Sequence, residues 1–215
     1  MKRIFTLVMA LLLALSLMTA CGGNNSNGST TPSLSSDSNN VSDEPGEFFG
    51  ADGLIDLRDN RNYFAVVNGV RYDMNTTIRN VLDDGYTVDE SAIDLKEILK
   101  PGSYKGTLNF YKGKDIYFTV HPINRTNNPI TQAECSIIYM YFSSSNPANV
   151  TIVCGLTIGS TLADVEKVFG VDYYSKTDTI VTYKPSNADN RAFTFMFDDS
   201  GKVKNILIQG DVAID

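Results

Sequence analysis

Apart from an apolar run within the first 21 residues, nearly all the side chains that could build a hydrophobic core lie after residue 46 of this 215-residue chain. Residues 22–46 contain seven Ser, five Asn and four Gly, and they include no aromatic residue. Such a segment cannot bury enough apolar surface to offset the entropy lost on ordering, so we expect a flexible linker. A random coil of this length has a reach of about 25–30 Å. Residues 47–215 are therefore the part that folds, and they suffice for one compact body.

The first 20 residues have the pattern of a secretion signal. Lys2 and Arg3 precede an apolar run from Ile4 to Leu17, which only Thr6 and Ser16 interrupt. The run is shorter than the roughly 20 apolar residues that a membrane-spanning helix needs. We therefore expect residues 1–20 to be a cleaved signal peptide.

The residues that follow the apolar run, Met18-Thr19-Ala20-Cys21, resemble the lipobox of bacterial lipoproteins. The resemblance implies that Cys21 carries acyl chains such as palmitate and becomes the first residue of the mature protein. Two acyl chains supply the double signal that stable anchoring needs, which implies a location on the outer face of the cell membrane. Residues 21–46 are similar to the tethers of Gram-positive lipoproteins. The alternative is an ordinary cleaved signal that happens to precede a cysteine.

The charge of the chain disfavours nucleic acid as a partner. Its 18 Lys and Arg are outnumbered by 25 Asp and Glu, for a net charge of −7, and no basic cluster occurs in the body. Removal of Lys2 and Arg3 would take the charge to −9. One His and three Cys exclude most His-rich metal sites and disulfide-dense scaffolds. We therefore expect no metal and no cofactor.

The body alternates short β-rich runs with turn signals and helical patterns, which predicts an α+β fold. Asn68-Gly69 is typical of a type I′ hairpin turn. Thr76 or Thr77 is expected to start a short helix that Gly85 ends, and a second helix is expected over Ser91–Lys100. Strands are expected over Asn62–Asp73 (as the hairpin), Thr107–Tyr111, Ile116–His121, Cys135–Phe142 and Val150–Cys154.

The last third predicts one helix packed on a three-stranded meander. Thr161 and Asp164 form a capping box, and Gly170 ends the helical pattern. Strands are expected over Thr179–Lys184, Ala192–Phe197 and Val203–Gln209. Alternation in the middle strand places Phe193, Phe195 and Phe197 on one face, which the helix should cover.

The segment Gly155–Leu162, followed by Asp164-Val165 and Val168–Gly170, resembles the helix entry of tandem helix-plus-meander repeats. Such repeats occur in the β-lactamase-inhibitory-protein-like fold and in small outer-membrane assembly lipoproteins. The resemblance implies two helix-plus-antiparallel-meander halves, about 47–154 and 155–215, with the helices on one face of the sheet. It also implies a non-catalytic protein that presents a sheet face or loop to a partner.

His121 and the two later cysteines are the residues with the most reactive chemistry. A catalytic dyad would have to use His121 with Cys135, Cys154 or a Ser, and no spacing favours this. Cys135 and Cys154 lie in neighbouring predicted strands outside the reducing cytosol, so they could form a disulfide. The alternative is that both are small buried hydrophobes.

Aromatic residues give the best candidate for a contact surface. If the larger apolar residues face the core, alternation sends Tyr111, Tyr117, Tyr139 and Tyr141 to the other face beside His121. Tyr is enriched in protein interfaces, although it also has high β-propensity and fills half-exposed sheets.

Together these features predict a lipid-anchored binding module of the cell envelope, with an inhibitor-like or assembly role. The expected ligand is a protein or a cell-wall component. Two alternatives are an envelope enzyme or accessory hydrolase that uses His121, and a structural protein of envelope assembly.

Overall fold

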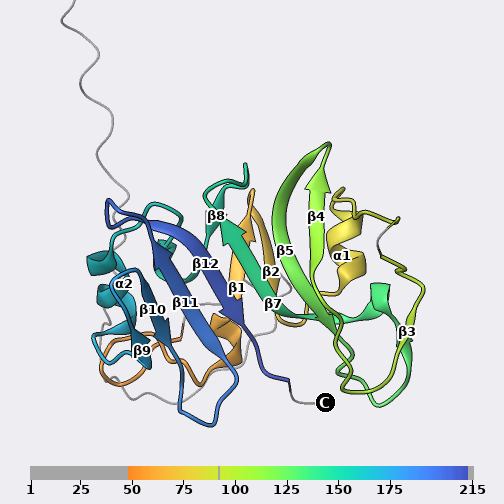
Figure 1. Ribbon diagram of the computed structural model, residues 1–215. Coiled ribbons are helices and arrows are strands. Elements are labelled where there is room, and N and C mark those ends of the chain that lie inside the picture. The colour runs from red at the N-terminus through yellow and green to blue at the C-terminus, as the bar shows by residue number, and fades with distance from the viewer. Residues whose placement is uncertain (1–47, 92, 213–215) are drawn as a thin grey trace, which may run out of the picture. The chain divides into compact units, whose positions relative to one another are not determined.

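The alternating β pattern folds most of the body into one large antiparallel sheet. The computed structural model describes residues 48–91 and 93–212, so the predicted signal peptide, Cys21 and the linker lie outside the described residues. The large sheet has seven strands (Figure 1). In spatial order they are β4 (Leu108–Lys112), β5 (Asp115–Ile123), β7 (Ser136–Ser143), β12 (Val203–Gln209), β11 (Ala192–Phe197), β10 (Ile180–Tyr183) and β9 (Ser175–Lys176).

Two smaller sheets complete the β structure. One is ordered β2 (Val70–Asp73), β1 (Phe64–Val67) and β8 (Val150–Thr151), and the other pairs β3 (Ile98–Leu99) with β6 (Ile130–Thr131). The predicted hairpin is confirmed, because β1 and β2 pair around Asn68 (φ 51°) and Gly69 (φ 86°). Both positions need positive φ, which Asn and Gly adopt at low cost.

The two α-helices are short and begin at capping boxes. Helix α1 (Ile78–Asp83) is capped by Thr77 with Asn80, and α2 (Leu162–Phe169) is capped by Thr161 with Asp164. Short 3-10 turns occur at η1 (Asn60–Asn62), η2 (Gln132–Glu134) and η3 (Val153–Gly155). No helix in the described ranges has both the length and the apolar character needed to cross a membrane.

Both helices and the small β1 sheet cover one face of the large sheet, and the core lies between them (Figure 1). On the α2 side, the Phe169 ring lies 5.0 Å from that of Phe193 and 5.5 Å from that of Phe195, which confirms that α2 covers the Phe193, Phe195 and Phe197 face. On the other side, Tyr72 of β2 stacks on Phe118 of β5, with ring centroids 5.7 Å apart.

The predicted α+β fold with two helix-plus-meander halves is wrong. The structure is mostly β, with 38% strand and 14% helix. The large sheet is continuous across the predicted boundary at 154 and 155, because β7 pairs with β12 through registers such as Tyr141↔Leu207. The two helices have six and eight residues, which is too short to form a helical layer over each half of the sheet, so most of the body is β structure.

The helix predicted over Ser91–Lys100 is also absent. The described residues of this segment form turns and then β3, which pairs Ile98 with Thr131. Asp89 and Asp94 accept hydrogen bonds from the backbone N–H groups of Ser91 and Lys96, two residues later. These local turns compete with the helix.

Candidate functional site

The large sheet has one covered face and one face that no described element packs on. Along its strands, buried residues alternate with partly exposed ones, so the second set points away from the core. We call eleven of these residues, in the central part of the sheet, the outer face. It comprises Asn109, Thr119, His121, Tyr139, Tyr141, Thr182, Thr194, Met196, Asn205, Leu207 and Gln209.

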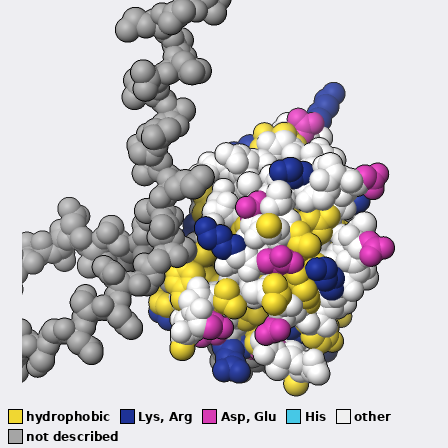
Figure 2. Space-filling view, turned by 90° about the vertical axis from the view of Figure 1, so that its left-hand side faces the viewer, with side chains coloured by type: hydrophobic (Ala, Val, Ile, Leu, Met, Phe, Trp, Pro, Cys, Tyr) yellow, Lys and Arg dark blue, Asp and Glu magenta, His cyan; other side chains and the backbone are white. Residues whose placement is uncertain are grey.

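None of these eleven side chains is Lys, Arg, Asp or Glu, although charged residues make up 20% of the chain; the exposed Lys204 lies next to Asn205, at one end of the outer face. One register row runs through Asn109, Thr119, Tyr141, Leu207 and Thr194 across five strands. The side of the body formed by α2, β9 and β10 is different, because there hydrophobic side chains are mixed with charged ones of both signs (Figure 2). The outer face is thus an uncharged surface on an acidic protein.

His121 and Tyr139 form a stacked pair on the outer face. Their rings stack with centroids 4.5 Å apart and planes 17° apart. Within the described part of the chain, the imidazole makes one polar contact, between Nε2 and the Thr107 hydroxyl at 3.5 Å. Burial lowers the pKa of His121 and raises the pKa of Tyr139. Burial therefore disfavours the charged imidazolium form, and among the described residues no carboxylate contacts the ring as in a catalytic dyad.

Only part of the predicted tyrosine surface forms. Tyr139 and Tyr141 lie together on the outer face, and Tyr111 lies at its margin, where its backbone pairs with Thr87 through N–H···O bonds of 2.8 and 2.9 Å. Tyr117 was wrongly placed on this surface. A register shift next to Phe110 and Tyr111 turns the Tyr117 side chain to the core side, where its ring lies 5.7 Å from that of Tyr86.

The sequence interpretation also missed half of the outer face. Leu207, Asn205, Thr194 and Met196 lie on β12 and β11 and continue the surface that starts at Tyr141. Alternation along each strand was visible in the sequence. The pairing of β7 with β12, which places Leu207 opposite Tyr141 and so joins the two halves of the outer face, was not visible in the sequence.

The two later cysteines do not form a disulfide. Both are free in the structure. Cys135 ends η2 with its thiol directed at the Thr131 carbonyl, at 3.5 Å, whereas Cys154 lies in η3 after β8. The predicted pairing is wrong because β8 pairs with β1, and the neighbours of β7 are β5 and β12.

We expect alkylation of the native protein to distinguish these cysteines. Burial raises the pKa of Cys135 from 9.0 to about 11, which lowers its thiolate fraction about 100-fold at neutral pH. Iodoacetamide should modify the partly exposed Cys154 and leave the buried Cys135 untouched until the chain is unfolded. Peptide mass spectrometry without reductant measures both sites. Equal labelling rates, or a peptide pair linked through Cys135 and Cys154, would contradict this arrangement.

In residues 48–91 and 93–212, no three His, Cys, Asp or Glu side chains come together as metal ligands would. Comparisons of the chain with protein-family models, with characterised proteins and with solved structures find no match. The fold and the outer face define the class: a mostly β body with one sheet face built into the core and one sheet face open and uncharged.

Proposed function

We propose that this chain is a lipid-anchored, extracytoplasmic binding module that contacts a partner protein through the outer face. The observation that carries the proposal is the absence of charged side chains from a surface that crosses the central strands of the large sheet. Burying uncharged Tyr, Leu, Met and Thr side chains costs far less desolvation free energy than burying Lys or Glu. Interface cores are depleted in charged residues for the same reason.

Several side chains of the outer face are already ordered before binding. The Thr119 hydroxyl donates to Asn109 Oδ1 at 2.7 Å, the Thr182 and Thr194 hydroxyls lie 3.1 Å apart, and His121 stacks on Tyr139. Immobilising a free side chain on binding costs about 0.5–1.5 kcal/mol. A surface that is ordered in advance avoids much of this cost, which suits a stable contact. Its breadth suits a protein rather than a small molecule.

Site-specific photocrosslinking tests the contact. A photoreactive residue replacing Tyr141 on the outer face should give one discrete adduct in cells, and the same residue at Val171, which is 67% exposed, should not. Adding Leu207→Asp should abolish the Tyr141 adduct, because a carboxylate would be desolvated at the centre of the contact. Thr182→Asp, at the margin of the outer face, should reduce the adduct less.

The same adducts from Tyr141 and Val171, or an adduct unchanged by Leu207→Asp, would contradict the proposed contact. The captured partner also separates the possible roles. An enzyme that loses activity on binding indicates an inhibitor, and a stoichiometric, constitutive partner indicates assembly.

Anchoring has its own test. We expect Cys21→Ser to move the protein from the membrane fraction to the soluble extracytoplasmic fraction and to abolish labelling by radioactive palmitate, because the acyl chains provide the attachment. Fractionation with immunoblotting measures this. Cys154→Ser serves as the matched control and should stay in the membrane fraction. Retention of the Cys21→Ser protein in membranes would contradict the lipid anchor.

A further inference from the structure

A second candidate recognition site lies between two turns of the large sheet, apart from the outer face. One turn, residues 177–179, joins β9 to β10, and the other, residues 198–202, joins β11 to β12. Residues of both turns and Leu162, at the start of α2, line a pocket of about 680 Å³, which we call the turn pocket. This volume falls within the range of roughly 300–1,000 Å³ that is typical of ligand sites. The turn pocket shares no residue with the outer face.

Both turns are held in place by hydrogen bonds of their own. In the first, the Thr177 N–H donates to the Ile180 carbonyl at 2.8 Å, and the Thr177 hydroxyl accepts from the Ile180 N–H at 3.1 Å. In the second, Asp198 Oδ1 accepts from the N–H and the hydroxyl of Ser200 at 2.9 and 2.7 Å. The walls of the turn pocket are therefore ordered without a ligand, which lowers the entropic cost of binding.

Apolar side chains form the base of the turn pocket. They are Leu162, which is partly exposed, Val181, which is 1% exposed, and Phe197, which is 5% exposed. An alkyl stem can pack against this base without leaving a hydrogen-bonding group unpaired. Each methylene that leaves water in this way strengthens binding about fourfold.

Carboxylates dominate the charge at the rim of the turn pocket. The lining has three aspartates, Asp178, Asp198 and Asp199, and one cation, Lys176. The ammonium group of Lys176 is directed at α2, where its Nζ lies 3.6 Å from Glu166 Oε1. The charge of Lys176 is therefore offset by Glu166, and the rim is acidic.

The surroundings of the second turn leave this charge in place. The pKa of Asp198 is lowered, mainly because the Ser200 hydroxyl donates to it, and the Lys202 N–H adds to this effect. The charge of Lys204 contributes less. Asp198 is therefore ionised at neutral pH. Lys202 and Lys204 follow the second turn, and neither lines the turn pocket.

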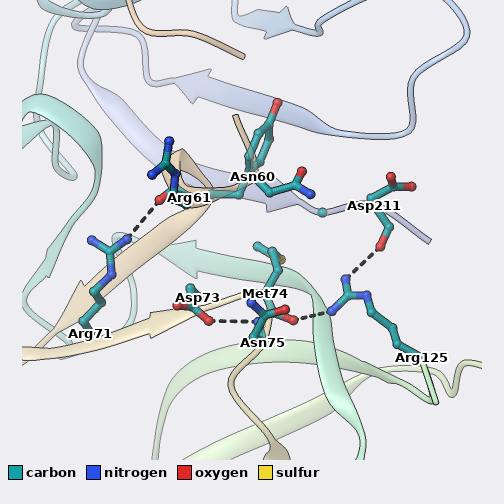
Figure 3. A pocket seen from close by; sticks show the side chains of 10 residues that line it. Asn60, Arg61, Arg71, Asp73, Met74, Asn75, Arg125 and Asp211 are labelled. Atoms are coloured by element: carbon teal, nitrogen blue, oxygen red, sulfur yellow. Dashed lines mark hydrogen bonds between the residues drawn. The ribbon is translucent and has the colours of Figure 1, made fainter. Parts of the chain in front are cut away.

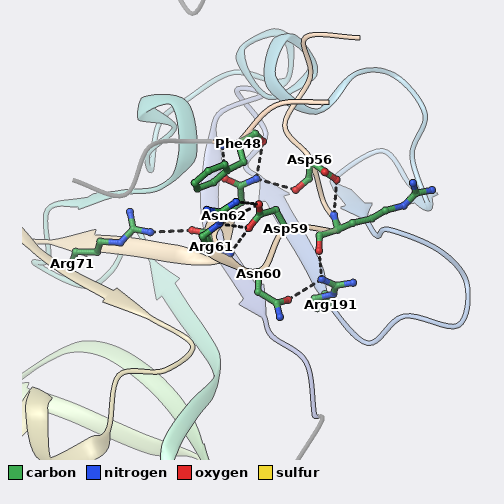
Figure 4. Close-up of polar contacts among 9 residues, drawn as sticks. Phe48, Asp56, Asp59, Asn60, Arg61, Asn62, Arg71 and Arg191 are labelled. Carbon is green, nitrogen blue, oxygen red and sulfur yellow. Dashed lines mark hydrogen bonds and ion pairs between the residues drawn. The ribbon is translucent and has the colours of Figure 1, made fainter. Parts of the chain in front are cut away.

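A smaller pocket of about 330 Å³ beside η1 differs from the turn pocket, because its cations are used within the chain. Its lining includes Arg61, Arg71 and Arg125. Arg71 donates to the Arg61 carbonyl at 2.9 Å, and Arg125 donates to the Asp211 carbonyl at 2.7 Å (Figure 3). The Arg61 Nη2 lies 2.6 Å from Asp59 Oδ2 (Figure 4). These contacts tie η1 to β2, and the segment after β5 to the segment after β12, so this pocket belongs to the scaffold of the body.

The turn pocket adjoins an edge of the large sheet. Strand β9 is the last strand in the sheet, and among the described residues no strand pairs with its outer side (Figure 1). An edge strand presents N–H and C=O groups to which an extended segment of another chain can add. Lys176 belongs both to β9 and to the lining of the turn pocket. A polypeptide that lies along β9 would therefore bring its side chains to the turn pocket, which a free cation would enter without such backbone contacts.

These features select the chemistry of the ligand. Lys and Arg combine an apolar stem with a cationic end, which matches an apolar base below an acidic rim. The net charge of −7 also favours the approach of a basic partner. An acidic side chain would be repelled at the rim. From this arrangement we propose that the turn pocket receives an arginine or lysine side chain from an extended segment of a partner protein that lies along β9.

Fluorescence anisotropy with labelled peptides and the full-length chain in mild detergent tests this site. A short peptide with a central Arg or Lys between β-forming residues should bind saturably. The citrulline peptide, which keeps the shape of the Arg peptide but lacks its charge, should bind at least about tenfold more weakly. Free butylguanidinium, which has the stem and the cation but no peptide backbone, should compete at least about tenfold more weakly than the Arg peptide.

Variants assign the binding to the turn pocket. The double variant Asp178→Asn with Asp199→Asn should weaken binding of the Arg peptide at least about fivefold. The matched control is Asp172→Asn with Glu90→Gln, which removes the same charge at exposed positions outside the lining and should change the affinity less than twofold, or about. Leu162→Ala, which shortens the apolar base, should weaken binding about threefold or more.

Four results would overturn the proposal: no saturation with either basic peptide, equal affinity for the Arg and citrulline peptides, equal weakening by the turn-pocket double variant and its control, or a butylguanidinium affinity equal to that of the Arg peptide. The last result would mean that the ligand is a free cation. All four are independent of the outer face, because the two sites share no residue.

Discussion

Phe118→Ala is expected to lower the free energy of unfolding by about 3–5 kcal/mol. Phe118 is fully buried, and its ring centroid lies 5.1 Å from that of Phe110, 5.3 Å from that of Tyr86 and 5.8 Å from that of Phe142. The loss combines the transfer free energy of the ring with the cost of the cavity that the surrounding rings cannot close. Phe110 and Phe142 are held by β4 and β7 of the large sheet, and Tyr72 of β2 in the small sheet also stacks on Phe118, so the surrounding rings can relax only partly.

Urea unfolding followed by far-UV circular dichroism measures the effect of Phe118→Ala. Tyr104→Ala is the matched control, because its side chain is 67% exposed and its removal should change the free energy by less than about 0.5 kcal/mol. A loss below about 1 kcal/mol in Phe118→Ala would mean that the two sheets do not pack around this ring.

Arg125→Met is expected to cost about 3 kcal/mol or more of unfolding free energy. The guanidinium joins three backbone carbonyls, those of Met74 after β2, Ile137 in β7 and Asp211 after β12. Methionine keeps most of the apolar length of the side chain, so little cavity forms. The loss comes from carbonyls that lose a charged donor away from solvent.

Thermal unfolding tests this role, since about 3 kcal/mol corresponds to a lowering of Tm by roughly 6–12 °C in a body of this size. Arg125→Lys should recover only part of the loss, because an ammonium cannot present a planar fork to three carbonyls. Arg79→Met is the matched control: this arginine forms an exposed ion pair with Glu134, and its loss should cost under about 1 kcal/mol. Equal losses of unfolding free energy in Arg125→Met and Arg79→Met would contradict the role of Arg125 in holding the three backbone carbonyls together.

Local features were predictable from the sequence wherever residues a few positions apart determine the structure by their own hydrogen bonds or backbone preferences. Asn68-Gly69 forms the hairpin turn, and the Thr161 and Asp164 side chains satisfy the first amides of α2, as expected. The Ser91–Lys100 helix failed because Asp turns at its start compete with helical hydrogen bonds. For the candidate site, alternation correctly placed Tyr139 and Tyr141 on one face. It failed at Tyr117, where one extra residue in β5 changes the side to which the ring points.

The sequence by itself determined the turns, the helix caps and the inward or outward direction of most strand residues, because these depend on groups within a few positions of one another. Only the tertiary structure decided that β7 pairs with β12, which makes one continuous sheet and extends the outer face from Tyr141 to Leu207. It also decided that Arg61, Arg71 and Arg125 line one pocket. Strand order and the meeting of distant side chains depend on how the whole core packs, and no local pattern encodes that packing.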